Sequence, residues 1–303
     1  MTSPLYRGRF APSPTGPLHF GSLVAAVASY ADARHRRGEW LVRIEDVDET
    51  RRQPDAETEI LRALKAFGMQ SDRTPERQSE RKTRYDTALQ HLIAQARVFR
   101  CNCSRKRLAS SAHLGPEGYI YPGTCRQSPP AANTPCAWRI RVDDKETTFD
   151  DRVLGRVRQN LADQVGDFVV RRLDGFTAYQ LAVVVDDHDQ GITDVVRGVD
   201  LLWSTPRQVW LQQLLGYSHP RYAHIPLVYG TDGHKLSKRD GAHPIDPDNP
   251  VPALSAAWRH LGQVPPPHRI GTSRDFWQWA TPQWNTKMVP NNRNVRHERT
   301  DTL

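Results

Sequence analysis

Apolar and polar positions along the first hundred residues follow the periods of helices and strands in alternation. Between residues 21 and 37 apolar side chains recur at helical spacing, and a basic run followed by Gly38 predicts the end of this helix. The apolar run 40–44 predicts a buried strand. Two further helices are predicted at about 55–67 and 80–95. This order of loop, helix, strand and helix is typical of an α/β domain with a parallel sheet.

The second half of the chain predicts more strands and helices. The segment 167–172, an Asp174-Gly175 turn and the apolar run 176–187 together predict a β-hairpin with a long buried second strand. In this interpretation Asp186 and Asp187 only cap the end of a strand. The remaining expected elements are strands at 137–142 and 224–229, helices at 206–215 and near 251–261, and a tryptophan-rich patch around 276–284.

Residues 100–136 interrupt this rhythm, because they carry all four cysteines, several turn formers and little periodicity. We interpret them as an insertion in the α/β domain. The expected parts are the first half of a catalytic domain (1–98), the insertion (99–136), the remainder of the catalytic domain (137–245), a short helical appendage (246–285) and a tail predicted to be disordered (286–303).

Composition and net charge indicate the kind of partner and the cellular compartment that we expect for this protein. The chain of 303 residues has a formal net charge of +8, which favours a polyanionic partner such as a nucleic acid, although a basic surface without a partner is the alternative. No apolar run reaches the roughly 20 residues of a membrane span, and the N-terminus lacks a secretory signal. We therefore expect a cytoplasmic protein. In a reducing compartment, clustered cysteines indicate a metal site before a disulfide.

Two segments have features suited to binding phosphate. The helix after PTGPLHFGS offers its N-terminal amides, with Gly16 and Gly21 allowing close approach of a ligand and His19 supplying a donor. The segment GHKLSKRDG at 233–241 places Lys235 and Lys238 three residues apart, a spacing suited to clamping a polyphosphate. Taken alone, the first is an ordinary loop-to-helix junction and the second a basic surface turn.

Together the two segments resemble the HIGH and KMSKS signatures of class I aminoacyl-tRNA synthetases. The sequences RFAPSPTG at 9–16, VRIEDVDETR at 42–51 and YQLAVVVDDHDQGITDVVRG at 179–198 resemble the glutamyl and glutaminyl enzymes of this class. The resemblance covers about residues 7–245 and implies a Rossmann-like catalytic domain with a parallel sheet. It also implies that residues 137–245 contain the remainder of an acceptor-binding-like region as well as the rest of the catalytic domain with the KLSKR loop. Two positions depart from the signatures, since Ser22 stands where HIGH ends in histidine and the second signature reads KLSKR.

The resemblance assigns roles in the activation of an amino acid by ATP. His19, Gly21 and Lys238 would bind ATP, Lys238 and Lys235 would stabilise the leaving pyrophosphate, and Mg²⁺ would accompany ATP. L-Glutamate would be bound by Arg9, Glu45, Tyr179, Arg197 and the loop residues Phe10, Ala11, Pro12 and Ser13. Guanidinium groups suit carboxylates, and Glu45 provides a counter-charge for the ammonium group. For Arg197 and Glu45, structural ion pairs at strand ends are the alternative.

The cysteines Cys101, Cys103 and Cys125 offer three ligands for one structural Zn²⁺, which requires four. Tyr121, His113 and Cys136 are candidates for the fourth, and buried free thiols are the alternative to a metal. The spacing in YPGTC resembles shortened glutamyl enzymes in which a tyrosine phenolate is the ligand, so Tyr121 is our choice.

Only about sixty residues follow the KLSKR loop, too few for the anticodon-binding domains of full-length glutamyl or glutaminyl enzymes. In this respect the chain resembles the glutamyl-Q tRNA(Asp) synthetases. Members of that family activate glutamate without tRNA and attach it to the queuosine at the wobble position of tRNA(Asp). The alternatives are a minimal synthetase charging the 3′ end of tRNA(Glu) and an inactive tRNA-binding paralogue. Intact Arg9, His19, Glu45, Lys235 and Lys238 argue against the paralogue. We expect a monomer.

Overall fold

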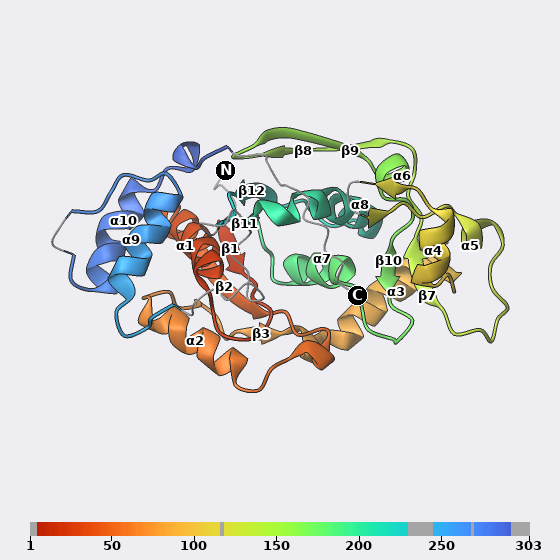
Figure 1. Cartoon of the computed structure of the whole chain (residues 1–303), viewed down its shortest axis with the longest axis horizontal. Helices are drawn as coiled ribbons and strands as arrows, with labels where there is room; N and C mark the ends of the chain where they lie inside the picture. Colours follow the sequence, from red (N-terminus) through yellow and green to blue (C-terminus); the bar gives the residue numbers. More distant parts are fainter. Residues whose placement is uncertain (1–4, 116–117, 230–244, 268–269, 292–303) are drawn as a thin grey trace.

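The computed structural model describes residues 5–115, 118–229, 245–267 and 270–291 (Figure 1). The segment 233–241, with Lys235 and Lys238, lies outside these residues, as does the part of the predicted tail beyond residue 291. Among the described helices, none is both long and apolar enough to cross a membrane.

A seven-stranded sheet lies at the centre of the molecule, in the order β3-β2-β1-β11-β12-β8-β9. Neighbouring strands from β3 through β8 run parallel, and β9 is antiparallel to β8. The predicted, mostly parallel sheet is thus confirmed. The strands are β1 (Arg7–Phe10), β2 (Glu39–Ile44), β3 (Glu76–Arg77), β8 (Glu146–Asp151), β9 (Gly155–Asn160), β11 (Asp194–Gly198) and β12 (Arg221–Ile225).

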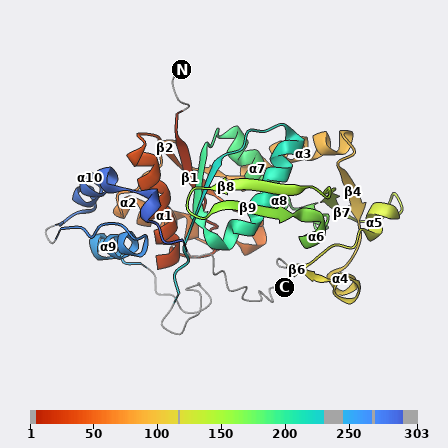
Figure 2. The same cartoon turned by 90° about the horizontal axis from the view of Figure 1, so that it is seen from above.

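Helices fill the connections between these strands. α1 follows β1 and packs against β1, β2 and β11, whereas α3, α7 and α8 pack on one another beside the sheet. Figure 2 shows the β8–β9 hairpin, which the sequence did not reveal, running past α8. The helices of this region are α1 (Phe20–His35), η1 (Glu49–Arg51), α2 (Ala56–Ala66), η2 (Gln78–Arg81), α3 (Lys82–Ala94), α7 (Tyr179–Asp189), η3 (Val199–Ser204) and α8 (Thr205–Leu215).

One secondary-structure prediction is wrong, because the run 176–187 forms helix α7 instead of the second strand of a hairpin. Its residues Leu181–Val185 are all buried, so the helix has no polar face and its pattern resembles that of a buried strand. Asp186 and Asp187 consequently lie in the last turn of a helix, where both are buried, and they do not cap a strand.

A smaller antiparallel sheet, in the order β10-β7-β4, carries the cysteine-bearing segment at one end of the molecule (Figure 1). The predicted strand at 137–142 forms β7 and pairs with β4 and β10 instead of joining the large sheet. The elements of this region are β4 (Val98–Cys101), α4 (Arg105–Ser111), β5 (Leu114–Gly115), β6 (Gly118–Tyr119), α5 (Thr124–Gln127), β7 (Ala137–Ile140), α6 (Leu161–Gln164) and β10 (Val169–Arg171).

The C-terminal helices α9 (Pro250–His260) and α10 (Ser273–Gln283) pack against α1 at the opposite end (Figure 1). The tryptophan-rich patch is part of this core, since Trp258, Trp277 and Trp284 are buried in it. The short helix η5 (Thr286–Met288) and the buried Val289 follow, so the prediction of a disordered tail is wrong for these first residues.

Asp32 on α1 connects the C-terminal segment to the catalytic domain through an ion pair and several hydrogen bonds. Its carboxylate is 1 % exposed and pairs with both terminal nitrogens of Arg152 at 2.6 and 2.7 Å. It also accepts hydrogen bonds from the Tyr6 hydroxyl at 2.5 Å, the Trp284 indole at 2.9 Å and the Thr286 hydroxyl at 3.2 Å. Breaking such a buried pair by removing one charge typically costs about 3–5 kcal/mol.

Candidate active site

The carboxyl ends of β1 and β11 meet at a switch point of the large sheet. These strands are neighbours, but the chain continues from β1 through α1 to β2 on one side and from β11 to β12 on the other. Ligands of open α/β sheets bind in the crevice that such a reversal creates. Two adjoining cavities, of about 120 and 330 Å³, open at this place and share Phe10, Ala11 and Gly198 in their walls.

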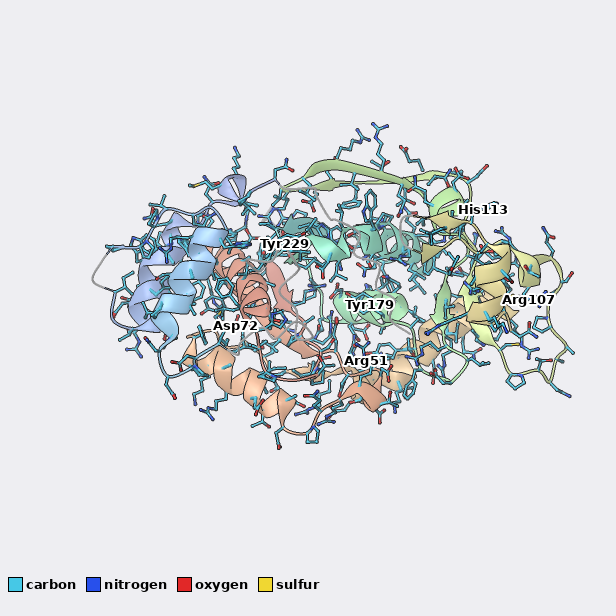
Figure 3. The ribbon with its side chains drawn as sticks, in the orientation of Figure 1. Arg51, Asp72, Arg107, His113, Tyr179 and Tyr229 are labelled. Carbon is cyan, nitrogen blue, oxygen red and sulfur yellow. The ribbon has the colours of Figure 1, made fainter. Side chains whose placement is uncertain are left out.

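The smaller cavity brings together most of the residues predicted to bind glutamate. Arg9 and Phe10 come from β1, Glu45 from the end of β2, Arg197 from β11 and Tyr179 from the first turn of α7, with Ala11 beside them. Figure 3 shows Tyr179 near the centre of the molecule, at the start of α7. Pro12 and Ser13, which we assigned to the same ligand, line the larger cavity instead.

A buried network of opposite charges forms the floor of the smaller cavity. Arg9 Nε lies 3.2 Å from Asp187 Oδ1, and Arg43 Nη2 lies 2.8 Å from the same oxygen. Arg43 also approaches Asp186 at 3.7 Å and Glu45 at 3.6 Å. The two carboxylates of α7 thus compensate Arg9 and Arg43, which would otherwise be unpaired buried charges.

Asp186 is in turn held by groups that follow β3. Arg81 Nε donates to it at 2.6 Å, the Gln78 amide at 2.7 Å and the Tyr85 hydroxyl at 3.0 Å. Burial raises the pKa of Asp186, while Arg43 and Arg81 oppose that rise. These contacts fix the last turn of α7 and therefore the orientation of the arginines that it faces.

Glu45 is a largely buried carboxyl group with one oxygen that lacks a hydrogen bond in the described residues. Its side chain is 10 % exposed, and burial raises its pKa to about 7, although Arg43 and Arg9 act in the opposite direction. Its buried Oε1 accepts no hydrogen bond from any residue that the structure describes. Burial also raises the pKa of the neighbouring Tyr179 to about 12, so its hydroxyl remains protonated at neutral pH.

A chain of hydrogen bonds orients Arg197. Arg197 Nε donates to His224 Nε2 at 3.1 Å, and His224 Nδ1 donates to Asp151 Oδ2 at 2.6 Å. Burial lowers the pKa of His224, which agrees with a neutral ring that carries its proton on Nδ1. Arg197 Nη2 donates to Thr205 Oγ1 at 2.7 Å, whereas the buried Nη1 has no hydrogen-bond partner within the described ranges.

Arg197 differs from Arg9 and Arg43 in its charge balance. In the part of the chain that the structure describes, no carboxylate forms an ion pair with it. The alternative of a structural ion pair is therefore wrong for Arg197, and for Glu45 it is limited to the 3.6 Å approach of Arg43. A guanidinium nitrogen and a carboxylate oxygen without hydrogen-bond partners in the described residues thus belong to two residues that line one cavity. Buried polar atoms in this state require an explanation, and a ligand in the cavity would provide one.

The larger cavity lies at the N-terminus of α1, where His19 and Gly21 line it as predicted. His19 is the N-cap residue of α1, with Nδ1 3.4 Å from the backbone nitrogen of Ser22 and Nε2 3.0 Å from its hydroxyl. Ser22 therefore contacts His19 at the position where the HIGH signature has its last histidine. Gly198 borders both cavities, and a Cβ atom there would lie 2.5 Å from Asp200 Oδ1.

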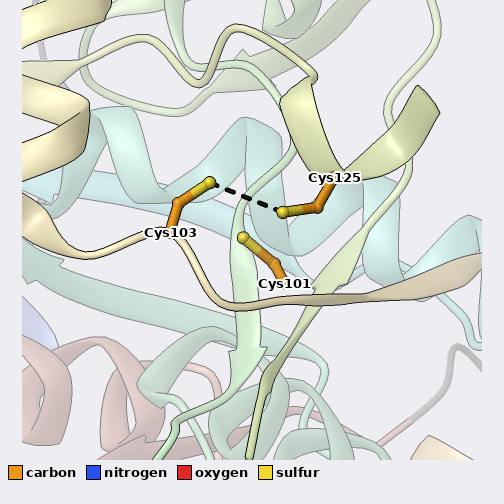
Figure 4. A group of neighbouring side chains, drawn as sticks. All are labelled: Cys101, Cys103 and Cys125. Carbon is orange, nitrogen blue, oxygen red and sulfur yellow. Dashed lines mark hydrogen bonds between the residues drawn. The ribbon is translucent and has the colours of Figure 1, made fainter. Parts of the chain in front are cut away.

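The insertion gathers Cys101, Cys103 and Cys125, whose sulfur atoms all lie within 4.8 Å of one another (Figure 4). The Tyr121 hydroxyl lies 3.5 Å from Cys101 Sγ and 3.9 Å from Cys103 Sγ. Neither His113 nor Cys136 belongs to this group. Burial opposes ionisation of the Cys101 thiol, but hydrogen bonding with Tyr121 and Arg139 outweighs it and lowers its pKa. Three thiols thus converge with the Tyr121 hydroxyl beside two of them, and this hydroxyl also accepts the Cys125 backbone N–H at 2.8 Å.

The sequence did not reveal Arg43, Asp151 and His224, nor the true place of Asp186 and Asp187. Arg43 carried a signal, because a charged residue within the apolar run 40–44 requires a buried partner. His224 and Asp151 carried none, because they are 73 residues apart and meet only through the pairing of β12 with β8.

Residues 6–249 match the family described as tRNA synthetases class I (E and Q), catalytic domain. The glutamyl-Q tRNA(Asp) synthetase of Dechloromonas aromatica (strain RCB) is 54 % identical, over 96 % of this chain and 97 % of the relative. The protein of that name from Chromobacterium violaceum is 50 % identical, over 96 % and 97 %. A glutamate tRNA ligase from Elizabethkingia meningosepticum, solved with its amino acid, superposes with a TM-score of 0.80 and 26 % identity over 95 % of this chain and 66 % of its own.

Proposed function

Since this chain belongs to the glutamyl-Q tRNA(Asp) synthetases, within the class I tRNA synthetases of the E and Q type, we propose that it activates L-glutamate with ATP in the cytoplasm and transfers it to the queuosine at the wobble position of tRNA(Asp). The first step joins a glutamate carboxylate to the α-phosphate of ATP and releases pyrophosphate. The second transfers the glutamyl group to a hydroxyl of queuosine and releases AMP.

The pair of unsatisfied atoms in the smaller cavity carries this proposal. Glu45 Oε1 accepts the ammonium group of the amino acid, and Arg197 Nη1 donates to a carboxylate. Arg9 and the Tyr179 hydroxyl add donors for the oxygens of the same ligand. A neutral amide in place of the side-chain carboxylate would leave the charge of Arg197 uncompensated, which favours glutamate over glutamine.

The adjoining cavity suits ATP, because it lies at the mouth of α1. The dipole and free amides at the N-terminus of α1 attract the phosphates, and His19 donates to them. The resemblance adds Lys235 and Lys238, which would balance the charge on the leaving pyrophosphate, and Mg²⁺ bound to the phosphates. Placing the two substrates in contiguous cavities accelerates attack mainly by proximity and orientation.

Cys101, Cys103, Cys125 and Tyr121 form the proposed ligand set of one structural Zn²⁺. Zinc–sulfur bonds of about 2.3 Å in a tetrahedron place sulfur atoms roughly 3.8 Å apart. The separation of 3.5 Å between Cys103 Sγ and Cys125 Sγ, and the 3.5 Å from Cys101 Sγ to the Tyr121 hydroxyl, fit this requirement. Such an ion would fix the fold of the insertion and takes no part in the proposed transfer.

Transfer of labelled glutamate to purified tRNA pools with and without queuosine tests the proposal. We expect label only on tRNA(Asp) that contains queuosine, and we expect this label to stay with the anticodon-loop fragment, not the 3′ end, after ribonuclease cleavage. Label on tRNA(Glu) regardless of queuosine would instead identify a minimal synthetase that charges the 3′ end. Absence of glutamate-dependent exchange between ATP and pyrophosphate would favour an inactive RNA-binding protein.

A further inference from the structure

A third cavity, of about 210 Å³, lies between α3 and the loop that leads into α7. Val47, Gln78, Lys82, Tyr85, Phe176 and Thr177 are among its walls. None of the residues assigned above to glutamate or ATP lines it.

Two segments of the chain line both this cavity and the glutamate cavity. Val47 follows Glu45 by two residues in the loop after β2, and Thr177 precedes Tyr179 by two residues at the start of α7. Gln78 lines the third cavity and at the same time donates to Asp186, which belongs to the charge network beneath the glutamate cavity. Both cavities are therefore bordered by the same pair of loops, and the third cavity adjoins the charge network that also contains Arg9 and Glu45.

The walls combine aromatic rings with hydrogen-bonding groups. Phe176 is half-buried, and the guanidinium carbon of the exposed Arg172 lies 5.6 Å from its ring centroid. Arg171 and Asp86 form an ion pair at the wall, and they supply donors and acceptors of the kind that read the edge of a base. An aromatic ring flanked by arginine is a common platform for an unstacked nucleobase.

The entrance also carries positive side chains. Lys82 is 61 % exposed, lines the cavity and pairs with the exposed Glu49. Arg172 pairs with Asp48 and Asp174 at the chain surface. These cations favour a ligand that is attached to a phosphate backbone over a free nucleoside.

We propose that this third cavity receives the acyl-accepting nucleoside, a single base that an RNA loop extrudes toward the glutamyl-adenylate. The inference rests on the proposed function and adds to it the place where the acceptor binds. A base stacked within an A-form stem cannot enter a cavity, so a nucleotide of a single-stranded loop is the class of ligand that fits.

In the transfer step of this proposal, a hydroxyl of the extruded nucleoside attacks the activated carbonyl carbon. The hydroxyl oxygen forms a bond to that carbon, and the carbon–oxygen bond of the mixed anhydride breaks. The electron pair of the broken bond leaves with AMP, and the hydroxyl proton passes to solvent or to the AMP phosphate. The products are a glutamyl ester and AMP, and no further reactant is needed.

Replacing Phe176 tests the inference, because adenylate formation and transfer can be measured separately. In Phe176→Ala, and in Phe176→Leu, which keeps most of the side-chain volume, we expect glutamate-dependent exchange between ATP and pyrophosphate to stay within about twofold of wild type. We expect kcat/KM for transfer to queuosine-containing tRNA(Asp) to fall about 10- to 100-fold, the usual range for loss of one stacking contact. Equal melting temperatures show that both variants are folded.

Lys82→Ala and Arg84→Ala form a matched pair, since each removes one exposed cation of α3 that pairs with a single carboxylate. We expect Lys82→Ala to raise KM for the tRNA several-fold more than Arg84→Ala does. Transfer at wild-type rates by both Phe176 variants would overturn the inference, as would a parallel loss of exchange and transfer. A wild-type enzyme that transfers glutamate to tRNA(Glu) alone would instead refute the proposed function.

Discussion

Replacing Asp151 by asparagine would change the tautomer of His224, whose Nε2 accepts a hydrogen bond from Arg197, while leaving the shape of the side chain almost unchanged. Asp151 Oδ1 accepts the backbone N–H groups of Val153 and Leu154 at 3.0 and 2.9 Å, and Oδ2 accepts His224 Nδ1–H at 2.6 Å. An asparagine that keeps the contacts to Val153 and Leu154 turns its NH₂ group toward His224 Nδ1, and also toward the His224 backbone N–H, which donates to Asp151 Oδ2 at 3.1 Å. The neutral ring must then accept at Nδ1 and carry its proton on Nε2, where it opposes the Nε–H of Arg197.

The loss can be estimated from the bond that disappears. A hydrogen bond to a charged group contributes about 1.5–3 kcal/mol, which corresponds to about 10- to 150-fold at roughly 1.4 kcal/mol per tenfold. Because Arg197 lines the glutamate cavity and His19 lines the other, the loss falls on one substrate. We expect kcat/KM for glutamate to fall by about this factor and KM for ATP to change less than about threefold.

Glutamate-dependent exchange between ATP and pyrophosphate measures both constants without tRNA. Asp150→Asn is the matched control, since Asp150 is the exposed neighbour of Asp151 on β8 and undergoes the same chemical change. Its kinetics should equal those of wild type. A folded Asp151→Asn enzyme with an unchanged KM for glutamate would refute the reasoning, and so would equal losses for glutamate and ATP.

Three further results are expected. Burial raises the pKa of Glu45 to about 7, so below that pH the carboxyl group of the free enzyme is neutral. The value of kcat/KM for glutamate should therefore fall about tenfold per pH unit below about pH 7. A flat profile between pH 5.5 and about 7 would contradict this. Tyr121→Phe should reduce zinc per chain in elemental analysis while Cys136→Ser leaves it unchanged, and the opposite result would make Cys136 the fourth ligand. Asp32→Asn should lower the free energy of unfolding in urea by about 3–5 kcal/mol, and a loss below about 1 kcal/mol would mean that Arg152 is stabilised elsewhere.

Local patterns were sufficient for much of the fold. Helix α1 was predicted within two residues at each end, because its apolar spacing and the glycine that follows it are local signals. Strand β2 and helix α8 were predicted for the same reason. The β8–β9 hairpin escaped notice, since its strands alternate polar and charged residues with few apolar ones.

Local sequence patterns predicted only part of the candidate active site. Signature segments predicted His19, Glu45, Tyr179 and Arg197 as site residues, and all four line the two adjoining cavities. The residues that compensate and orient them were not found, since they come from distant segments that only the folded sheet brings together. Asp186 and Asp187 were even visible in the sequence, but the wrong secondary structure gave them the wrong role.

The helical conformation of α7 matters for the site, because only a helix lets Asp186 and Asp187 of one element both pair with Arg43. In a strand, Asp186 and Asp187 would point to opposite faces of the sheet, whereas in a helix they are about 100° apart and both reach Arg43. With Arg9 and Arg43 neutralised in this way, Glu45 and Arg197 remain as the charges that face a ligand. In the adenylate the α-carboxylate is part of a mixed anhydride, so the ammonium group and the side-chain carboxylate are the charged groups that remain to be bound. In the proposed binding mode this charge balance selects glutamate in the activated state, because glutamine lacks the negative charge that Arg197 requires.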